Sequence, residues 1–515
     1  MSSGTNHYII AYDLGTGGNK ASLYGPDGSC AVSAFVPYET FYPDTGWHEQ
    51  RPADWWKAVV ESTRELKAES GFSPSEVRSI SISGHSLGVV PVDGAGTLLR
   101  DKTPIWSDTR ASRQTGAFFA EQDRDGWYMT TGNGFPAECY AVFKIMWYRD
   151  SEPEMFSKVH KILGTKDYIN YKLTGRMVTD YSYASGSGVY DLAGWRYSDE
   201  FIRASGLPAD IFPEIVPSTE VIGNLTWEAA ETLGLSTDTR VVCGGVDNSC
   251  MALGARNIRD GRVYTSMGSS SWIAVSSKEP VLDAATKPFV FTHVVPGLFT
   301  SAVSIFAAGS SFRWLRDVVF ADIAAREKET GEDPYEVMTR LAESSPPGAN
   351  RLLFNPSLAG GTSQEMNKVI RGAFAGLDLG HTRGDLVRSA MEGIAMNLAL
   401  VFEILKGFTP VEDTMLLVGG GSKSSVWRRI FADVFDMKML KTNIDQDAGS
   451  LGAAAVAAVG TGLWDGFHRI DEVHSVLETA VPDAERTAVY RGLRPAFQYL
   501  RETQAKLGEM LFSLA

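Results

Sequence analysis

Three short segments of the chain combine glycine, hydroxyl and acidic residues at spacings that could bind phosphate groups or move a proton. The first is YIIAYDLGTGGNKASLY, residues 8–24, in which an apolar run meets Asp13 and then a glycine-rich turn. Glycines let successive backbone N–H groups converge on an anion, and Thr16 and Lys20 add a hydroxyl and a cation nearby. An acid at the end of a buried strand is costly unless it is paired or near a metal ion. The segment predicts either a phosphate cradle with a metal-binding acid or a plain hairpin turn, with equal weight.

The second segment, GGVDNSCMALGA, spans residues 244–255 and has an acid directly after a pair of glycines. A carboxylate at Asp247 could act as a general base that accepts the proton of a substrate hydroxyl, which contributes roughly 10²–10⁴ in rate. Asp247 and Asn248 are equally good helix N-caps. In isolation the segment favours neither interpretation over the other.

The third segment, LLVGGGSKSSVWRRIFAD, spans residues 416–433 and leads an apolar strand into three consecutive glycines. Glycines followed by a helix N-terminus would let a purine or a ribose lie against the backbone. The alternative is a tight strand-to-helix turn capped by a serine, which three consecutive glycines make somewhat less favoured.

The elements that must position these segments alternate between strand and helix, which is typical of α/β architecture. Residues 261–277, GRVYTSMGSSSWIAVSS, repeat the plan of the opening segment, an apolar strand followed by a Gly/Ser-rich turn and a second apolar strand. The pattern predicts further helices over 52–70, 151–173 and 382–408, a strand over 77–84, two short strands within 88–99, and a strand-turn-helix over 414–435.

Length and composition narrow the function classes. At 515 residues, with 44% hydrophobic and 21% charged residues, the chain fits a globular protein of two or three domains. A net charge of −14 without a dense Lys/Arg run argues against a nucleic-acid or membrane partner. The start of the chain has no signal-peptide pattern, and its 4 cysteines form no C-x-x-C pair. We therefore expect a cytoplasmic protein with no disulfide framework.

With these segments in view, the chain resembles the FGGY family of carbohydrate kinases from residue 8 to about residue 464. The most specific match is GAFAGLDLGHTRGDLVRSAME, residues 372–392, which fits the C-terminal signature of the family. CYAVFKIMWYRD fits the other signature only in part, with Lys144 and Trp147 present but Ala141 in place of Pro, Ser or Thr. Xylulokinase-type pentulose kinases are the most similar group within the family.

The resemblance implies a fold of two actin-like, ribonuclease H-type α/β domains, with ATP and sugar in the cleft between them. We place the N-terminal domain at residues 1–249 and the C-terminal domain at 250–515. Asp13 would hold Mg²⁺, and Asp247 would be the catalytic base and a sugar contact together with Asn248. The resemblance assigns the phosphates and the adenosine of ATP to Thr16, Gly17, Gly18, Lys20, Ser269, Gly309, Arg313, Gly419, Gly420, Gly421 and Ser424. Family members are often dimers, so a homodimer is an expected form.

The sugar site departs from the pattern of the xylulokinase group. Ser86 and Leu87 stand where that group has a Met-His pair, and His85 precedes them. A site built to hydrogen-bond a hydroxyl discriminates strongly, so this exchange could change specificity. His85 could contact the sugar instead, or it could be a core histidine. By resemblance, Trp106 and Asp108 also lie on the sugar side.

We therefore expect an ATP- and Mg²⁺-dependent kinase that phosphorylates a ketopentose, with D-xylulose giving its 5-phosphate as the first candidate. Another small sugar or polyol, such as ribulose, glycerol or erythritol, is the alternative substrate. A non-catalytic actin-like sugar or ATP-binding protein is less favoured, because such a protein has no need of a general base.

Overall fold

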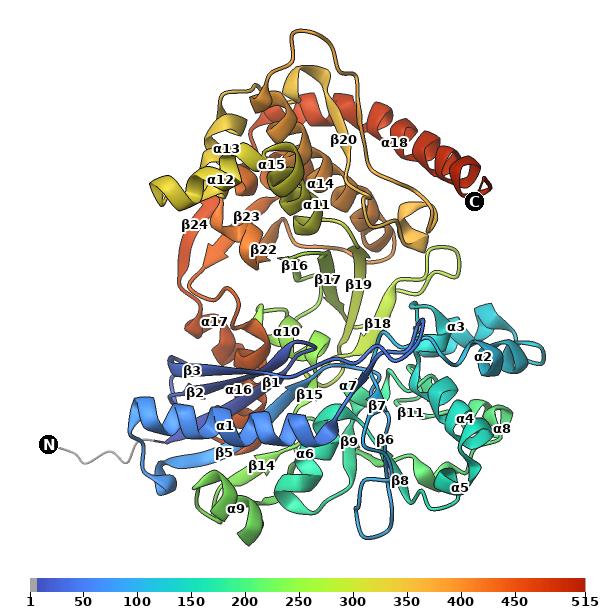
Figure 1. Ribbon diagram of the computed structural model, residues 1–515. Coiled ribbons are helices and arrows are strands. Elements are labelled where there is room, and N and C mark those ends of the chain that lie inside the picture. Colours follow the sequence, from blue (N-terminus) through green and yellow to red (C-terminus); the bar gives the residue numbers. More distant parts are fainter. Residues whose placement is uncertain (1–6, 515) are drawn as a thin grey trace, which may run out of the picture. The chain divides into compact units, whose positions relative to one another are not determined.

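The computed structural model describes residues 7–514, apart from the side chains of residues 328, 329 and 363. The chain forms two compact units, each assembled from separate stretches of sequence. The first contains the chain up to Arg259, Ser276–Thr300 and Asp447–Val473, and the second contains Asp260–Val275, Ser301–Gln446 and the chain from His474. The units therefore do not divide at one point, whereas the sequence interpretation places one boundary between residues 249 and 250. A sheet in each unit, combined with helices, confirms the α/β fold class (Figure 1).

The first unit is built on a 7-stranded sheet in the order β13-β14-β5-β1-β2-β3, with β15 also paired to β5. The opening segment forms the expected hairpin, in which β1 and β2 are antiparallel and Asp13 lies opposite Lys20. β5 runs parallel to β1 on its other side. The strands are β1 (Tyr8–Leu14), β2 (Gly18–Tyr24), β3 (Cys30–Pro37), β5 (Val77–Gly84), β13 (Val221–Asn224), β14 (Arg240–Val242) and β15 (Gly245–Val246).

Two helices cover the hairpin on opposite faces. Successive side chains of a strand point to opposite faces of its sheet. The Asn19 amide donates to Ser62 in α1 (Pro52–Ser70), whereas Tyr24, five residues further along β2 and so on the other face, hydrogen-bonds Ser450 in α16 (Ala448–Gly460). The run LGAAAVAAVG, residues 451–460, thus becomes a buried helix against the sheet. Other helices of this unit include α2 (Ser112–Phe119), α3 (Arg124–Thr131), α4 (Ala141–Ser151), α6 (Thr165–Thr174), α7 (Tyr181–Ala184), α8 (Asp199–Ser205), α9 (Trp227–Leu233) and α10 (Asp247–Gly254).

Helices α10 and α16 approach each other through a pair of glycines. A Cβ added at Gly254 would lie 1.8 Å from the carbonyl oxygen of Ala448, and one added at Gly452 would lie 1.9 Å from the carbonyl oxygen of Cys250. Each helix therefore presents a glycine to the backbone of the other. The contact holds the middle and the end of α10, whose first residue is Asp247, against the helix that covers the hairpin.

The second unit repeats the arrangement of hairpin and parallel neighbour. β16 and β17 form an antiparallel hairpin, and β22 runs parallel to β16, as β5 does to β1. The similarity between the two Gly/Ser-rich segments is thus confirmed as a shared structural plan. The sheet runs through β19 (Phe299–Ile305), β17 (Ser271–Ser277), β16 (Val263–Met267), β22 (Thr414–Val418), β23 (Lys438–Thr442) and β24 (Val476–Ala480).

The long helix α14 (Arg383–Lys406) lies at the centre of the helices of this unit (Figure 1). Thr382 caps it, and the Asp385 side chain accepts the Thr382 N–H at 2.7 Å, so the two residues form a capping box. Within the helix, the Arg388 guanidinium donates to Glu392 at 2.7 Å. The polar residues of the most specific family segment therefore stabilise the helix. The other helices are α11 (Gly309–Trp314), α12 (Ala321–Thr330), α13 (Pro334–Glu343), α15 (Ser425–Phe435) and α18 (Ala484–Phe512).

Local patterns predicted most of these elements, with two errors. Of the two short strands expected within 88–99 only one forms, and Leu98 makes an isolated bridge to Val92. Residues 151–173 are not one helix, because β8 (Lys161–Leu163) separates α5 (Pro153–Phe156) from α6 and pairs with β6 (Val90–Val92). Pairing across the chain decided this segment, and a helical period within it could not reveal the pairing. Among the described residues, no helix combines the length and the apolar composition that crossing a membrane requires.

The glycine contact between α10 and α16 generates a stability prediction. We expect Gly452→Ala to destabilise the first unit by ~1–3 kcal/mol or more, because the new methyl group meets a backbone carbonyl that cannot move alone. The measurement is the midpoint of thermal unfolding by calorimetry, which should fall by several degrees.

Gly116→Ala is the matched control. Gly116 lies within α2, and an added Cβ there meets no atom within 4 Å. Because alanine is the better helix former, this variant should be neutral or stabilised by up to ~1 kcal/mol. Equal midpoints for the two variants would contradict the close packing of α10 on α16.

Candidate active site

The candidate site of the first unit lies where three parallel strands end side by side. The register places Asp13 of β1 level with Ser83 of β5 and places Gly245 of β15 level with the same serine. Asp247 follows β15 directly as the first residue of α10. The ends of parallel strands share one edge of the sheet, which is where open α/β sheets bind ligands. Asp13 is close enough for its charge to raise the pKa of Asp247.

Asp13 is a half-buried carboxylate with a hydroxyl on one side and a glycine on the other. The Ser83 hydroxyl donates to Oδ1 at 2.7 Å. Burial raises the pKa of Asp13, although the Ser83 hydroxyl and the Lys20 ammonium oppose the shift. A Cβ at Gly449 would lie 2.6 Å from Oδ2 of Asp13, so the carboxylate rests against the first turn of α16.

Lys20 is ion-paired to Asp447, which directly precedes α16. The sequence interpretation assigns Lys20 to the phosphates but does not single out Asp447, which is separated from it by 427 positions. The only local signal is the run NIDQDAGS, in which acids precede a small-residue helix. The ion pair joins the hairpin to α16, so Lys20 does not present an unpaired ammonium.

Asp247 has the environment of a general base. Its Oδ1 accepts the backbone N–H of Asn248 at 2.8 Å. The N-cap of α10 is Val246, so the alternative in which Asp247 caps the helix is not what the structure has. Burial, followed by the charge of Asp13, raises the pKa of Asp247 to about 7. A carboxyl group with such a pKa can accept a proton near neutral pH.

The turn of the opening hairpin is held by its carbonyl groups, while two of its residues stay exposed. The Gln50 amide donates to the carbonyl of Thr16 at 2.8 Å, and the Tyr38 hydroxyl donates to the carbonyl of Gly15. A Cβ at Gly18 would lie 2.6 Å from the carbonyl oxygen of Val36 in β3. Thr16 and Gly17 are exposed, and a Cβ at Gly17 would meet no atom within 4 Å. Packing therefore explains Gly18, whereas the open space at Gly17 leaves room for a ligand.

Two of the predicted sugar contacts lie inside the unit. His85 is buried, its Nδ1 lies 3.3 Å from the Thr165 hydroxyl, and its ring meets Trp55 edge-on. Burial lowers the pKa of His85 to about 4, so the imidazole is neutral at pH 7. Leu87 is also buried and packs in an apolar cluster. Both side chains are buried, which suits the alternative that His85 is a core histidine. Its Nε2 has no hydrogen-bond partner among the described residues, so a contact between His85 and the sugar stays a prediction.

Asp108 is also turned inward. Its carboxylate is fully buried and forms an ion pair with Arg110, whose Nη2 lies 2.7 Å from Oδ2. The same oxygen accepts the backbone N–H of His48 at 2.7 Å. These partners occupy the carboxylate, and the geometry gives no support for a direct sugar contact by Asp108.

Trp106, Ser86 and Asn248 complete the sugar-side residues. Trp106 is 37% exposed, Asn248 is half-buried beside Asp247, and Ser86 is buried. The indole N–H of Trp106 donates to the Thr16 hydroxyl at 3.0 Å. The structure thus joins a predicted sugar contact to a predicted phosphate contact.

Lys144 supports the two segments that carry these residues. Its buried ammonium donates to the carbonyl of Leu87 at 3.1 Å and to the carbonyl of Ile105 at 2.6 Å. These carbonyls adjoin Ser86 and Trp106 in the chain. Burial lowers the pKa of Lys144 to about 8. Sequence reasoning noted this lysine only as part of a signature and could not show what it holds.

In the second unit, the structure brings together the three residues expected near the phosphates. The backbone N–H of Gly309 donates to the carbonyl of Gly268 at 3.0 Å, and the Arg313 guanidinium donates to the Ser269 hydroxyl at 3.1 Å. A Cβ at Gly309 would lie 2.3 Å from the Gly268 carbonyl oxygen. Only glycine therefore allows α11 to start this close to the β16–β17 turn.

The triple glycine follows β22 in the same unit. Gly419 has φ +88° and donates its N–H to Asp445 at 2.8 Å. Cβ atoms at Gly419 and Gly421 would each lie 2.7 Å from atoms of Met267, whereas one at Gly420 would meet no atom within 4 Å. The Ser424 hydroxyl caps α15 by accepting the Trp427 N–H at 3.3 Å. Ser424 therefore acts as a helix cap, and its contact with adenosine stays a prediction. Asp445 is a residue that sequence reasoning missed.

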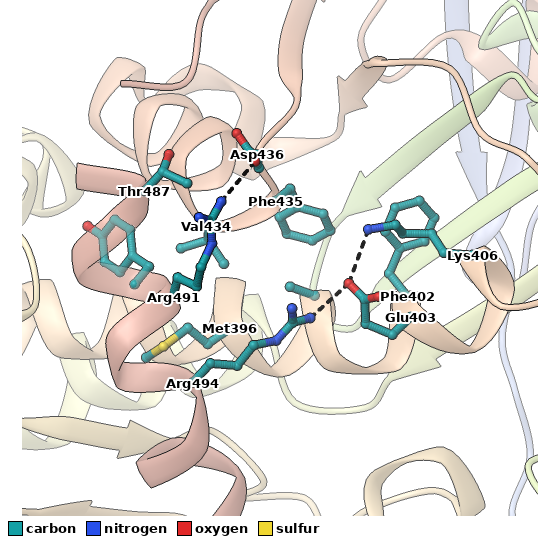
Figure 2. A pocket seen from close by; sticks show the side chains of 12 residues that line it. Met396, Phe402, Glu403, Lys406, Val434, Phe435, Asp436, Thr487, Arg491 and Arg494 are labelled. Atoms are coloured by element: carbon teal, nitrogen blue, oxygen red, sulfur yellow. Dashed lines mark hydrogen bonds and ion pairs between the residues drawn. The ribbon is translucent and has the colours of Figure 1, made fainter. Parts of the chain in front are cut away.

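A separate pocket of about 150 Å³ lies among α14, α15 and α18 of the second unit (Figure 2). Arg491 pairs with Asp436 on one side, and Glu403 accepts from Arg494 and Lys406 on the other. None of the predicted site residues lines this pocket. The pocket is therefore not part of the candidate site in either unit.

The first-unit site can accept a divalent cation only with help from other ligands. Among the side chains that the structure describes, no group of three or more His, Cys, Asp or Glu residues could hold a metal. Mg²⁺ usually keeps several waters and binds one or two carboxylates together with substrate phosphates. Asp13 and Asp247 repel each other, so a cation near Asp13 would offset uncompensated negative charge. The residues present therefore fit Mg²⁺ bound largely through water and phosphate.

Known proteins match this chain over most of its length. Residues 8–254 match the N-terminal domain and residues 263–461 the C-terminal domain of the FGGY family of carbohydrate kinases. A xylulose kinase of Bacillus subtilis is 30% identical over 94% of this chain and 95% of its own. A gluconokinase of the same organism is 29% identical over 95% of this chain and 94% of its own.

The solved structures similar to this chain include xylulose kinases, as the sequence relatives do. Ligand-bound xylulose kinase from Lactobacillus acidophilus superposes with a TM-score of 0.88 at 25% identity, covering 97% of this chain and 98% of its own. This chain therefore belongs to the FGGY family of carbohydrate kinases.

Proposed function

We propose that this kinase transfers the terminal phosphoryl group of ATP to a hydroxyl of a neutral ketopentose, with D-xylulose giving its 5-phosphate as the first candidate. Family membership supports ATP as the donor and a carbohydrate as the acceptor. The observation that carries the proposal is Asp247, a carboxylate at the end of β15 whose pKa of about 7 suits a general base.

In this proposal, Asp247 accepts the proton of the attacking sugar hydroxyl as the oxygen–phosphorus bond forms and ADP leaves. Phosphoryl transfer needs little covalent help from the protein, so positioning and charge stabilisation supply most of the effect. Asn248, next to the base, is proposed to orient the sugar. Trp106, being partly exposed, is proposed to pack against it.

The phosphate contacts are proposed for both units. In the first, the Thr16 hydroxyl and the backbone of Gly17 and Gly18 would donate to the phosphates. In the second, Ser269, Gly309 and Arg313 would do so, while Gly419–Gly421 and Ser424 would bind the adenosine. Lys20 would act on the hairpin through Asp447, because the two are already ion-paired.

Asp13 is the residue we propose to hold Mg²⁺. Burial raises the pKa of Asp13, and its charge raises the pKa of Asp247, so a cation beside Asp13 would stabilise both carboxylates. When bound, Mg²⁺ would neutralise the charge on the phosphate oxygens. Ser83 and Gly449 would orient the Asp13 carboxylate toward it, because one donates to Oδ1 and the other leaves space for Oδ2.

Gluconate is the second candidate, because the relatives include a gluconokinase. A substrate carboxylate calls for a cation that is not already paired. Lys20 is paired with Asp447, Arg110 with Asp108, and the Lys144 ammonium is bonded to two carbonyls. These three cations near the candidate site are therefore engaged, which favours a neutral sugar.

A panel of substrates tests the proposal. We expect ADP release with D-xylulose to exceed that with ribulose, glycerol, erythritol and gluconate in a coupled assay. Asp247→Asn should lower kcat by roughly 10²–10⁴-fold, because the amide cannot accept the proton. ATP binding by the variant should stay within about twofold of the original.

Asp465→Asn is the matched control, because Asp465 is an exposed acid of the same unit that pairs only with His468 at 3.5 Å. It should keep full activity. Turnover of gluconate but of no pentulose would show that the second candidate is the substrate. Full turnover by Asp247→Asn would show that Asp247 is not the general base.

The acid limb of the pH profile tests the charge coupling at the site. Asp247 works as a base only when deprotonated, so kcat/KM should fall as the pH drops below about 7. Because the charge of Asp13 raises this pKa, added free Mg²⁺ should move the midpoint to lower pH at a constant concentration of Mg–ATP. An acid limb that does not respond to free Mg²⁺ would contradict a cation at Asp13.

Gly449→Ala tests the position of the Asp13 carboxylate. The new methyl group would lie 2.6 Å from Oδ2, and the carboxylate must move away. A displaced supporting contact typically costs roughly 10- to 100-fold in metal affinity or activity. We therefore expect a higher Mg²⁺ concentration for half-maximal activity.

A side-chain end can move at little cost, so the unfolding midpoint of Gly449→Ala should stay close to that of the original protein, unlike that of Gly452→Ala. An unchanged Mg²⁺ requirement at full kcat would contradict the assignment of Asp13.

A further inference from the structure

The hydrogen bond between Trp106 and Thr16 determines where the proton of the Thr16 hydroxyl can point. The indole N–H of Trp106 lies 3.0 Å from the Thr16 hydroxyl oxygen. An indole can only donate, so the hydroxyl oxygen must be the acceptor. The proton of that hydroxyl is then directed elsewhere, and among residues 7–514 it is donated to no other side chain or carbonyl.

From this geometry we infer that Trp106 is a positioning residue for phosphoryl transfer, which orients the Thr16 hydroxyl so that its proton faces the phosphates. The inference rests on the proposed function, because it takes the hairpin to be a phosphate site. It assigns Trp106 a second role besides packing against the sugar.

The segment that carries Trp106 also holds the backbone of Thr16. β4 (Glu49–Gln50) pairs with β7 (Thr103–Pro104), which lies just before Trp106. Gln50, from the first of these strands, donates to the Thr16 carbonyl at 2.8 Å. Gln50 of β4 therefore holds the Thr16 carbonyl. Trp106, two residues after the end of β7, holds the Thr16 hydroxyl.

This segment is anchored to the interior rather than free to follow the hairpin. The carbonyl of Ile105, which precedes Trp106, accepts the buried Lys144 ammonium at 2.6 Å and the backbone N–H of Asp108 at 3.1 Å. Asp108 is itself fixed by its ion pair with Arg110. The buried polar residues thus determine the place of the Trp106 backbone, and Trp106 in turn determines the orientation of Thr16.

Orientation matters here because Thr16 is the one hydroxyl residue in the turn GTGG, residues 15–18. The glycines can supply only backbone N–H groups. A hydroxyl that is already oriented stabilises developing charge without reorganisation in the reaction. A freely rotating hydroxyl would lose part of that effect.

A double-mutant cycle tests the inference. Trp106→Phe keeps an aromatic ring and removes the N–H, and Thr16→Val keeps the shape of the side chain and removes the hydroxyl. We expect each variant to lower kcat by about tenfold, within the coupling range of hydrogen-bonded pairs. In the Thr16→Val background, Trp106→Phe should lower kcat no further, because its effect passes through the missing hydroxyl.

Thr16→Ser is the conservative variant: it keeps the hydroxyl and should restore most of the kcat that Thr16→Val loses. The KM for the sugar, measured for every variant, separates orientation from sugar packing. Unfolding midpoints close to that of the original protein should accompany all variants, since Trp106 and Thr16 are both exposed.

Additive losses in kcat, or a Trp106→Phe variant that raises only the KM for the sugar, would overturn the inference and leave the proposed function intact. Absence of turnover by the original protein with every sugar of the panel would instead overturn the proposed function, and the inference with it. A non-additive cycle in kcat supports both.

Discussion

The repulsion between carboxylates at the edge of one parallel sheet is the constraint around which the candidate site is arranged. Asp13 and Asp247 are brought together by β1, β5 and β15. Burial raises the pKa of each carboxyl group, and the charge of Asp13 raises the pKa of Asp247 further. The Ser83 hydroxyl and the Lys20 ammonium offset part of this charge. The remaining negative charge favours a divalent cation and keeps the pKa of Asp247 at about 7.

Close helix packing holds these charges in place. Helix α16 meets the Asp13 carboxylate through Gly449 and meets α10, which carries Asp247, through Gly452. A larger side chain at either position would move a carboxylate or separate the helices. The small residues of α16 therefore form the surface against which both acids are positioned.

The sugar side depends on buried polar residues rather than on exposed ones. Lys144 holds the carbonyls next to Ser86 and Trp106, and Asp108 is paired with Arg110. Buried charges are costly unless they are paired or hydrogen-bonded, so these groups fix the loops that carry them. Asp108, a sugar contact by resemblance, is thus held inside the unit, whereas Trp106 is partly exposed.

The sequence by itself determined the two hairpins, the α/β class, the glycine-rich turns and the acids at strand ends, because periodicity and turn chemistry are local. The family resemblance, carried by contiguous motifs, was equally readable. Only the tertiary structure decided that Lys20 pairs with Asp447, that His85 and Asp108 face inward, and that Trp106 holds Thr16. These contacts join residues as much as 427 positions apart. Local spacing carries no record of such pairings, because chain topology and packing bring the partners together.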